Sequence, residues 1–190
     1  MRRPALLAIL VAIAVVGAAV RPAAADEDSG ARSSYWSVSL LGGALVPLPP
    51  MNEDHQIGLV AGLRTGWTSK LGLGLGLAAD YSPLPRRTAD GVTYETHYGT
   101  VTAGPHWTIG HDTVRLTIGG GGGVALEQTT ARGATVERSR RAVPAAVGEV
   151  VLELHVIGGG GFLLGGGAGF TFGDDPYRYA YGLGGLTLTF

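Results

Sequence analysis

The sequence predicts an all-β fold, namely an eight-stranded antiparallel up-and-down transmembrane β-barrel preceded by a cleavable signal peptide. Three observations lead to this prediction. Apolar and small or polar residues alternate with a period of two in one segment after another. Long and short connections alternate between these segments. The last segment, finally, ends on an aromatic residue, Phe190.

Residues 1–25 have the pattern of an export signal. Arg2 and Arg3 form a basic start, residues 5–20 are apolar, and the small residues Ala23–Ala25 follow. The apolar stretch is shorter than the roughly 20 residues that a membrane-spanning helix requires. We therefore expect cleavage after this segment rather than a helical membrane anchor.

The expected mature chain has a short periplasmic N-terminal segment, residues 26–33, and a barrel domain, residues 34–190. The whole sequence has 14 basic and 15 acidic residues. Without Arg2, Arg3 and Arg21, 11 basic residues remain against 15 acidic ones, which gives a net charge of −4. This charge argues against a nucleic-acid partner. The sequence contains no Cys, so we expect neither disulfides nor a lipid-modified cysteine.

The clearest strand signal lies in residues 71–81. Leu71, Leu73, Leu75 and Leu77 share one face of an extended chain, and the intervening positions are mostly Gly. A helix would distribute these leucines around its whole circumference. Similar alternation predicts eight strands, at about residues 34–46, 56–68, 71–82, 92–108, 113–128, 142–156, 159–173 and 179–190.

The connections between these strands alternate in length. Those after the first, third and fifth strands are long (47–55, 83–91 and 129–141), whereas those after the second, fourth and sixth are short (69–70, 109–112 and 157–158). Transmembrane β-barrels have long outer loops and short periplasmic turns. An even number of strands then brings both termini to the periplasmic side.

Aromatic residues are expected to form a girdle at the periplasmic edge of the barrel, where amphipathic rings favour the membrane–water interface. The first strand begins with a tryptophan, and the second and fourth strands end with one. The predicted girdle consists of Trp36, Trp67, Trp107, Phe162 and Phe190.

No cofactor, metal or catalytic site is expected. Gly120, Gly122 and Ala125 fit a loose G-x-G-x-x-A pattern, but no helix pattern follows to bind a pyrophosphate. Glycine is abundant, at 33 of 190 residues, and small side chains suit the narrow interior of an eight-stranded barrel. The five histidines do not have metal-ligand spacing.

Six charged residues point into the predicted lumen, because they alternate with the apolar face. They are Arg64, Asp80, Arg115, Glu127, Glu149 and Glu153. One interpretation is an internal salt-bridge network that plugs the barrel, and the other is a narrow polar channel that favours cations. We expect an Arg115–Glu153 ion pair, whereas Arg64 and Asp80 are not expected to be direct cross-strand partners.

The chain ends in an alternating strand in which Leu186, Leu188 and Phe190 share one face. This ending resembles the C-terminal signature of bacterial outer-membrane barrels, and the mature chain resembles the small eight-stranded outer-membrane β-barrel family (OmpA/OmpX-like and opacity-protein-like). The resemblance implies export by the Sec route, location in the cell outer membrane with periplasmic termini, and assembly by the barrel assembly machinery. It also implies that these three residues carry the assembly signal.

Arginines cluster in the predicted outer loops. Arg86, Arg87, Arg138, Arg140 and Arg141 are hypothesised to contact lipopolysaccharide, because guanidinium groups match phosphate in a bidentate manner. The alternative is an ordinary solvated loop surface. The family resemblance implies outer-membrane lipid as a partner, and nothing in the sequence identifies an extracellular partner.

These patterns favour a non-enzymatic integral outer-membrane protein with a structural or surface-interaction role. The alternative is a small pore for passive transport across the outer membrane. A third hypothesis is a lipid A-modifying enzyme, because some small barrels of the family use a Ser, a His and an acid near the outer leaflet. The late strands of this chain offer no close Ser–His pair.

Overall fold

The computed structural model describes residues 33–49, 56–89, 91–110, 113–157, 159–173 and 176–190. The predicted signal peptide, and all but the last residue of the predicted N-terminal segment, lie outside the described residues. Among the described residues, no helix is long and apolar enough to cross a bilayer.

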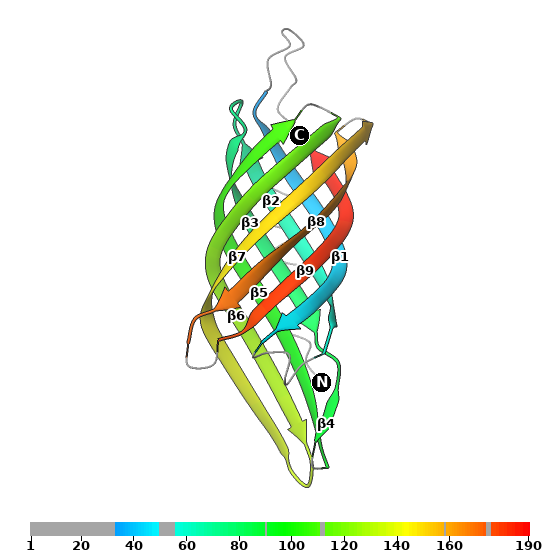
Figure 1. The fold of residues 1–190 in the computed structure, drawn as a ribbon, viewed down its shortest axis with the longest axis vertical. Coiled ribbons are helices and arrows are strands. Elements are labelled where there is room, and N and C mark those ends of the chain that lie inside the picture. Colours follow the sequence, from blue (N-terminus) through cyan, green and yellow to red (C-terminus); the bar gives the residue numbers. More distant parts are fainter. Residues whose placement is uncertain (1–32, 50–55, 90, 111–112, 158, 174–175) are drawn as a thin grey trace. The chain divides into compact units, whose positions relative to one another are not determined.

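The described residues form one closed antiparallel β-barrel of eight long strands and one short strand (Figure 1). Each long strand pairs with the next long strand in sequence, β3 with β5 included, and the barrel closes where β1 pairs with β9. The predicted fold class is confirmed. The strands are β1 (Tyr35–Leu48), β2 (Gly58–Thr68), β3 (Leu73–Pro83), β4 (Arg87–Ala89), β5 (Val92–Gly110), β6 (Val114–Arg132), β7 (Val136–Ile157), β8 (Gly160–Thr171) and β9 (Arg178–Thr189).

The period-two pattern separates an apolar outer surface from a small and polar interior. In β3, Leu73, Leu75 and Leu77 are 57%, 66% and 45% exposed, whereas Gly76 lines the interior cavity and Gly74 faces the His106 side chain inside the barrel. A water-soluble barrel would not leave large apolar side chains exposed on each of its eight long strands. A barrel in lipid requires this arrangement.

The two ends of the barrel differ. At the end that we call the turn end, β2 joins β3, β5 joins β6 and β7 joins β8 through short connections. At the opposite end, which we call the loop end, β5, β6 and β7 continue beyond the other long strands and form a sheet with β4 (Figure 1). β5 pairs with β3 only from His97 onward, and β7 pairs with β8 only from Ala145 onward.

The structure corrects the prediction of a long loop at residues 129–141. β6 continues to Arg132 and β7 begins at Val136, so only three residues separate the two strands. This segment is polar on both faces, and periodicity of apolar residues could not reveal it. β4, inside the predicted loop 83–91, pairs with the start of β5.

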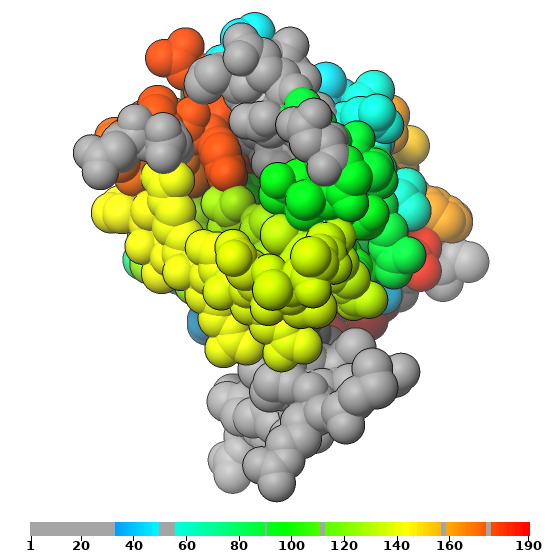
Figure 2. Space-filling model, turned by 90° about the horizontal axis from the view of Figure 1, so that it is seen from below, coloured from blue at the N-terminus to red at the C-terminus, as the bar shows by residue number. Residues whose placement is uncertain are grey.

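We call residues 87–89, 92–96, 128–132 and 136–143 the protruding sheet. In the view from the loop end (Figure 2), the residues of the β6–β7 hairpin, yellow and yellow-green, lie together as one patch. This hairpin is therefore a major part of the surface at the loop end.

The barrel interior has two different halves. The half near the loop end is packed with buried side chains, among them Leu45, Val60, Tyr98 and Tyr179. The half near the turn end contains a cavity of about 100 Å³ lined by glycines and hydroxyl side chains. The described lumen is therefore filled at one end and hollow at the other.

Glycines in the hollow half make room for His106 of β5. The His106 Nε2 atom lies 2.8 Å from Thr68 Oγ1. A Cβ atom at Gly66 would lie 3.2 Å from the imidazole, and one at Gly74 would contact both the imidazole and the Trp67 carbonyl oxygen. By contrast, a Cβ atom at the outward-facing Gly42 would have no atom within 4 Å.

We therefore expect Gly74→Ala to destabilise the barrel by about 1–3 kcal/mol through overpacking. Gly42→Ala, the same change in another strand, should alter stability by less than about 0.5 kcal/mol. Urea unfolding of the two variants in lipid vesicles measures the difference. Equal effects of both substitutions would show that the wall around His106 is loosely packed.

Candidate functional site

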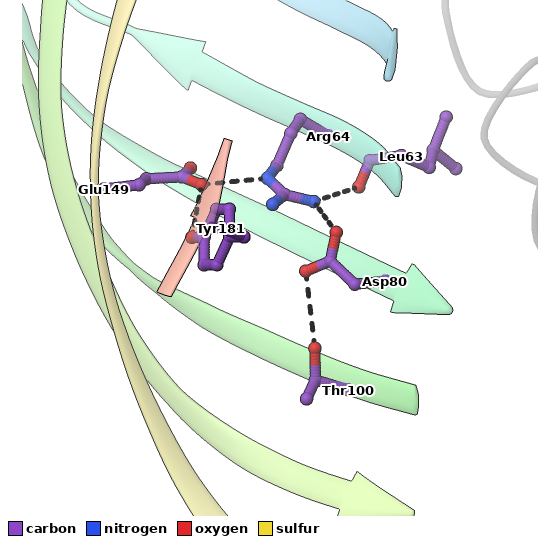
Figure 3. A network of polar contacts seen from close by, with 6 residues as sticks. All are labelled: Leu63, Arg64, Asp80, Thr100, Glu149 and Tyr181. Carbon is purple, nitrogen blue, oxygen red and sulfur yellow. Dashed lines mark hydrogen bonds and ion pairs between the residues drawn. The ribbon is translucent and has the colours of Figure 1, made fainter. Parts of the chain in front are cut away.

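A charged network crosses the middle of the barrel interior, centred on Arg64 of β2 (Figure 3). The Arg64 Nη1 atom donates to Asp80 Oδ1 of β3 at 2.7 Å and to the Leu63 carbonyl oxygen at 3.3 Å. The Arg64 Nε atom donates to Glu149 Oε2 of β7 at 3.1 Å. One guanidinium group therefore links the two carboxylates across the lumen.

Neutral hydroxyl groups complete the network. Thr100 Oγ1 donates to Asp80 Oδ2 at 3.3 Å, and the Tyr181 hydroxyl donates to Glu149 Oε2 at 3.1 Å. The side chains of Arg64, Asp80 and Glu149 are only 13%, 16% and 22% exposed. Charges this far from water are tolerated because they are paired and hydrogen-bonded.

The sequence analysis missed the contact between Arg64 and Asp80. The two residues are indeed not direct cross-strand partners, because Arg64 faces Ala78 and Asp80 faces Gly62. They meet diagonally, which the long arginine side chain permits. A Cβ atom at Gly62 would lie 2.5 Å from Asp80 Oδ1 and 3.1 Å from Arg64 Nη1, so this glycine leaves the space for the ion pair.

The other predicted lumen charges lie apart from this network. Arg115 and Glu153 are direct register partners on β6 and β7. The Glu153 carboxylate lies 3.0 Å from His155 Nε2, and the Arg115 guanidinium lies 4.3 Å from the centre of the Tyr35 ring. The Arg115–Glu153 ion pair itself stays a prediction.

Glu127 lies at the loop end of the lumen. Its Oε1 atom accepts hydrogen bonds from the Tyr177 hydroxyl at 2.9 Å and from Thr129 Oγ1 at 3.1 Å. Tyr98 packs against Tyr177 and Tyr179. These tyrosines, together with the buried aliphatic residues, occupy the interior between Glu127 and the Arg64 network.

The predicted girdle residues lie on the outer surface. Trp36 and Trp67 are direct register partners near the turn end, and Trp107 faces Leu73. Their exposures are 51%, 39% and 49%. The remaining predicted girdle and assembly residues are also exposed, at 59% for Phe162, 58% for Leu186, 53% for Leu188 and 49% for Phe190.

Arginines gather on the outward face of the protruding sheet, around Glu95. Its carboxylate pairs with Arg86 at 3.4 Å and with Arg132 at 3.3 Å, and His97 Nε2 lies 3.8 Å from Oε1. Register places Arg138 on the same face, through Thr130, which is the partner of both Glu95 and Arg138. Register likewise places Arg140 on this face, because Gln128 is the partner of both His97 and Arg140.

We call Arg86, Arg132, Arg138 and Arg140 the arginine face. The structure thus divides the five arginines that the sequence analysis grouped together. Arg87 faces Tyr94, and Arg141 faces Glu127 and lies 5.8 Å from the Tyr177 ring, so both belong to the opposite side of the sheet. Arg132, which completes the face, was not among the predicted contacts.

The arginine face begins where the apolar outer surface ends. On the same side of β6 and β5, Val124, Leu126 and Val101 are 46%, 54% and 48% exposed. Tyr81 and His97 stand at the boundary, with the Tyr81 hydroxyl 2.6 Å from His97 Nδ1. Within the described ranges, no three His, Cys, Asp or Glu residues lie together as metal ligands would.

Comparison with solved structures assigns the fold. Over 84% of this chain and 100% of the other, the barrel superposes on a major outer membrane protein from Thermus thermophilus with a TM-score of 0.64 and 9% identity. Neisserial surface protein A gives a TM-score of 0.58 at 11% identity over 85% of this chain and 100% of that chain. The fold is that of the small outer-membrane β-barrels.

The attachment invasion locus protein Ail of Yersinia pestis is similar as well, with a TM-score of 0.53 and 15% identity over 83% of this chain and 97% of Ail. No protein-family model matches the sequence. No curated protein matches it either. The similarity to these small barrels therefore concerns architecture, and the arginine face and the Arg64 network have to be interpreted from this chain alone.

The Arg64 network leads to a prediction for stability. Arg64→Leu leaves two buried carboxylates without their cation and should cost about 3–5 kcal/mol. Adding Asp80→Leu should recover part of that loss, with a coupling of about 0.5–3 kcal/mol in a double-mutant cycle. Urea unfolding in lipid vesicles measures each step. A cycle with the distant Arg138→Leu serves as the control and should be additive.

Proposed function

We propose that this chain is a non-enzymatic integral protein of the outer membrane with a structural and surface-interaction role. We further propose that its arginine face binds the phosphate groups of lipopolysaccharide. The observation that carries the proposal is the position of this face, immediately beyond the apolar outer surface of the barrel.

The position matters because the chemical groups of a lipid leaflet change with depth, from acyl chains to headgroups. Residues such as Leu126 and Val101 would contact acyl chains, so the next outward side chains along the same strands meet the headgroups. On β5 these side chains include His97 and Glu95, and on β6 and β7 they include Arg132, Arg138 and Arg140. Arg86 joins them through its ion pair with Glu95. Phosphates are the anions at that depth in a lipopolysaccharide leaflet, and guanidinium groups bind them in a bidentate manner.

Glu95 pairs with two arginines of this face but leaves the face positively charged. Among the described residues, this face has four arginines and one carboxylate. Arg86 and Arg132 are 69% and 62% exposed, and ion pairs this exposed contribute little to stability. The arginines can therefore exchange Glu95 for a phosphate group at little cost.

A related fold offers limited support. A structure of Ail was determined in complex with the heparin analogue sucrose octasulfate, at a TM-score of 0.53 and 15% identity to this chain. That ligand is a polyanion, and its binding is a property of Ail. The present proposal rests on the arginines of this chain.

The pore alternative receives no support from the described interior. Buried residues such as Leu45, Tyr98 and Tyr179 occupy the half near the loop end, and the ion pairs of the Arg64 network span the middle. For the orientation, we propose Sec export and barrel assembly with the turn end in the periplasm. The protruding sheet then lies outside the cell.

We expect Arg138→Gln to weaken binding of lipopolysaccharide several-fold, because each charge-assisted hydrogen bond contributes about 1.5–3 kcal/mol before solvent screening. Arg87→Gln removes the same charge from the opposite side of the sheet and should leave binding unchanged. Fluorescence titration of labelled lipopolysaccharide with detergent-solubilised protein measures both. Equal losses in both variants, or full binding of dephosphorylated lipopolysaccharide, would contradict the proposal.

The orientation has its own test, because the natural chain has no cysteine. Position 134 lies in the exposed connection between β6 and β7, and Lys70 lies in the exposed turn between β2 and β3. A membrane-impermeant maleimide added to whole cells should label Ala134→Cys and not Lys70→Cys until the outer membrane is opened. The reverse pattern would place the turn end outside.

A further inference from the structure

The first part of β7 pairs with a neighbouring strand on one side only. From Val136 to Ala145, β7 pairs with β6, but its pairing with β8 begins at Ala145 opposite Thr171. Among the described residues, the last backbone hydrogen bond on that side joins the Phe172 N–H to the Pro144 carbonyl oxygen at 2.9 Å. In the described part of the chain, no strand pairs with the outer side of Val136–Arg140.

The direction of the backbone groups along this edge follows from alternation. In a strand, successive residues direct their N–H and C=O groups to opposite neighbours. Pro144 directs its carbonyl to the β8 side, and His155, an odd-numbered residue, donates its N–H to Thr113 on the β6 side. The even-numbered Val136, Arg138 and Arg140 therefore direct N–H and C=O groups to the open side.

The edge is exposed and basic. Val136, Arg138 and Arg140 are all exposed. Between Val136 and Arg141, three arginines accompany one carboxylate, that of Glu137. Pro144, which has no N–H, stands where the open row of donors meets the β8 pairing.

We propose that this edge of β7 binds an extended acidic polypeptide segment, which adds to the protruding sheet as a further strand. Backbone hydrogen bonds to Val136, Arg138 and Arg140 would supply the affinity, as in other cases of strand addition. Acidic side chains opposite Arg138 and Arg140 would supply the selectivity, because opposite charges on paired strands attract. The occupant is a polypeptide, so this inference goes beyond lipopolysaccharide binding.

The charges argue against a second copy of this chain as the occupant. Antiparallel pairing of two such edges about Ser139 would place Arg138 of one copy opposite Arg140 of the other. Like charges directly opposite each other destabilise a strand pair. Charged side chains and proline also protect an exposed edge from aggregation, and pure protection is the competing explanation that the experiment must exclude.

The experiment uses the full barrel in lipid nanodiscs and an eight-residue peptide of alternating Thr and Glu as the probe. Two variants are matched: Val136→Pro with Arg140→Pro, and Val136→Ala with Arg140→Gln. Both lose the same two side chains, but only the proline pair loses two N–H donors on the open side. Proline is tolerated at such edge positions, and the β6–β7 ladder keeps all of its donors.

We expect the wild-type barrel to bind the peptide and the Ala/Gln pair to bind it several-fold more weakly. The proline pair should bind it at least about tenfold more weakly than the Ala/Gln pair, because two backbone hydrogen bonds are lost. In the wild type, the peptide should slow hydrogen exchange of the Arg138 amide. Heat-modifiable migration on gels checks that each variant retains a folded barrel.

A peptide N-methylated at alternate residues provides the same test on the wild-type barrel, should the proline pair fail to fold. It retains the acidic side chains but loses the donors of one edge, and we expect it to bind at least about tenfold more weakly. Equal affinities of the two variants, or equal binding of the methylated peptide, would overturn strand addition. Equal binding of a Thr–Lys peptide would overturn the selectivity for acidic segments. No binding of the Thr–Glu peptide would identify the edge as purely protective.

Discussion

The pairing of β1 with β9 is the interaction on which the rest of this structure depends. It joins the first and last strands of a sheet whose other long strands pair in chain order, and it leaves the barrel wall without an edge. In lipid every backbone polar group needs a partner within the protein, so a closed sheet is one of the few permitted forms. Closure also forces each strand to present one face outward and one face inward. The leucine rows and the glycine-lined interior follow from that division.

The sequence predicts most of the barrel and less of the sites for a physical reason. Where one face meets lipid, as at Leu73–Leu77, apolar periodicity identifies the strand and the direction of each side chain. On the protruding sheet neither face contacts acyl chains, so apolar periodicity is absent. The backbones of β6 and β7 nevertheless stay paired as far as Arg132 opposite Val136. The Arg64–Asp80 contact was missed because parity assigns a face but not the diagonal reach of a long side chain. The division of the arginines between two faces likewise required the register.

Unequal strand lengths connect the two proposed surfaces. β6 and β7 have 19 and 22 residues, whereas β8 has 12. The excess length carries Arg138 and Arg140 past the apolar outer surface, and the same excess leaves β7 without a β8 partner there. A single feature of the chain thus produces both a basic outward face and an open edge. Charge on that edge reduces the aggregation risk that an open strand otherwise carries.

The Arg64 network connects strands across the interior of this barrel. Apolar residues of similar volume often stabilise an interior as well as a buried ion pair does, so stability alone does not explain three charges in the lumen. Their geometric effect is specific, because Arg64 connects β2 to β3 and to β7 across the barrel. The network lies between the cavity, which Arg64 and Glu149 line, and the tyrosine-filled half. The side chains of the described interior thus pair and pack with one another, whereas the two proposed binding surfaces lie on the outside of the protruding sheet.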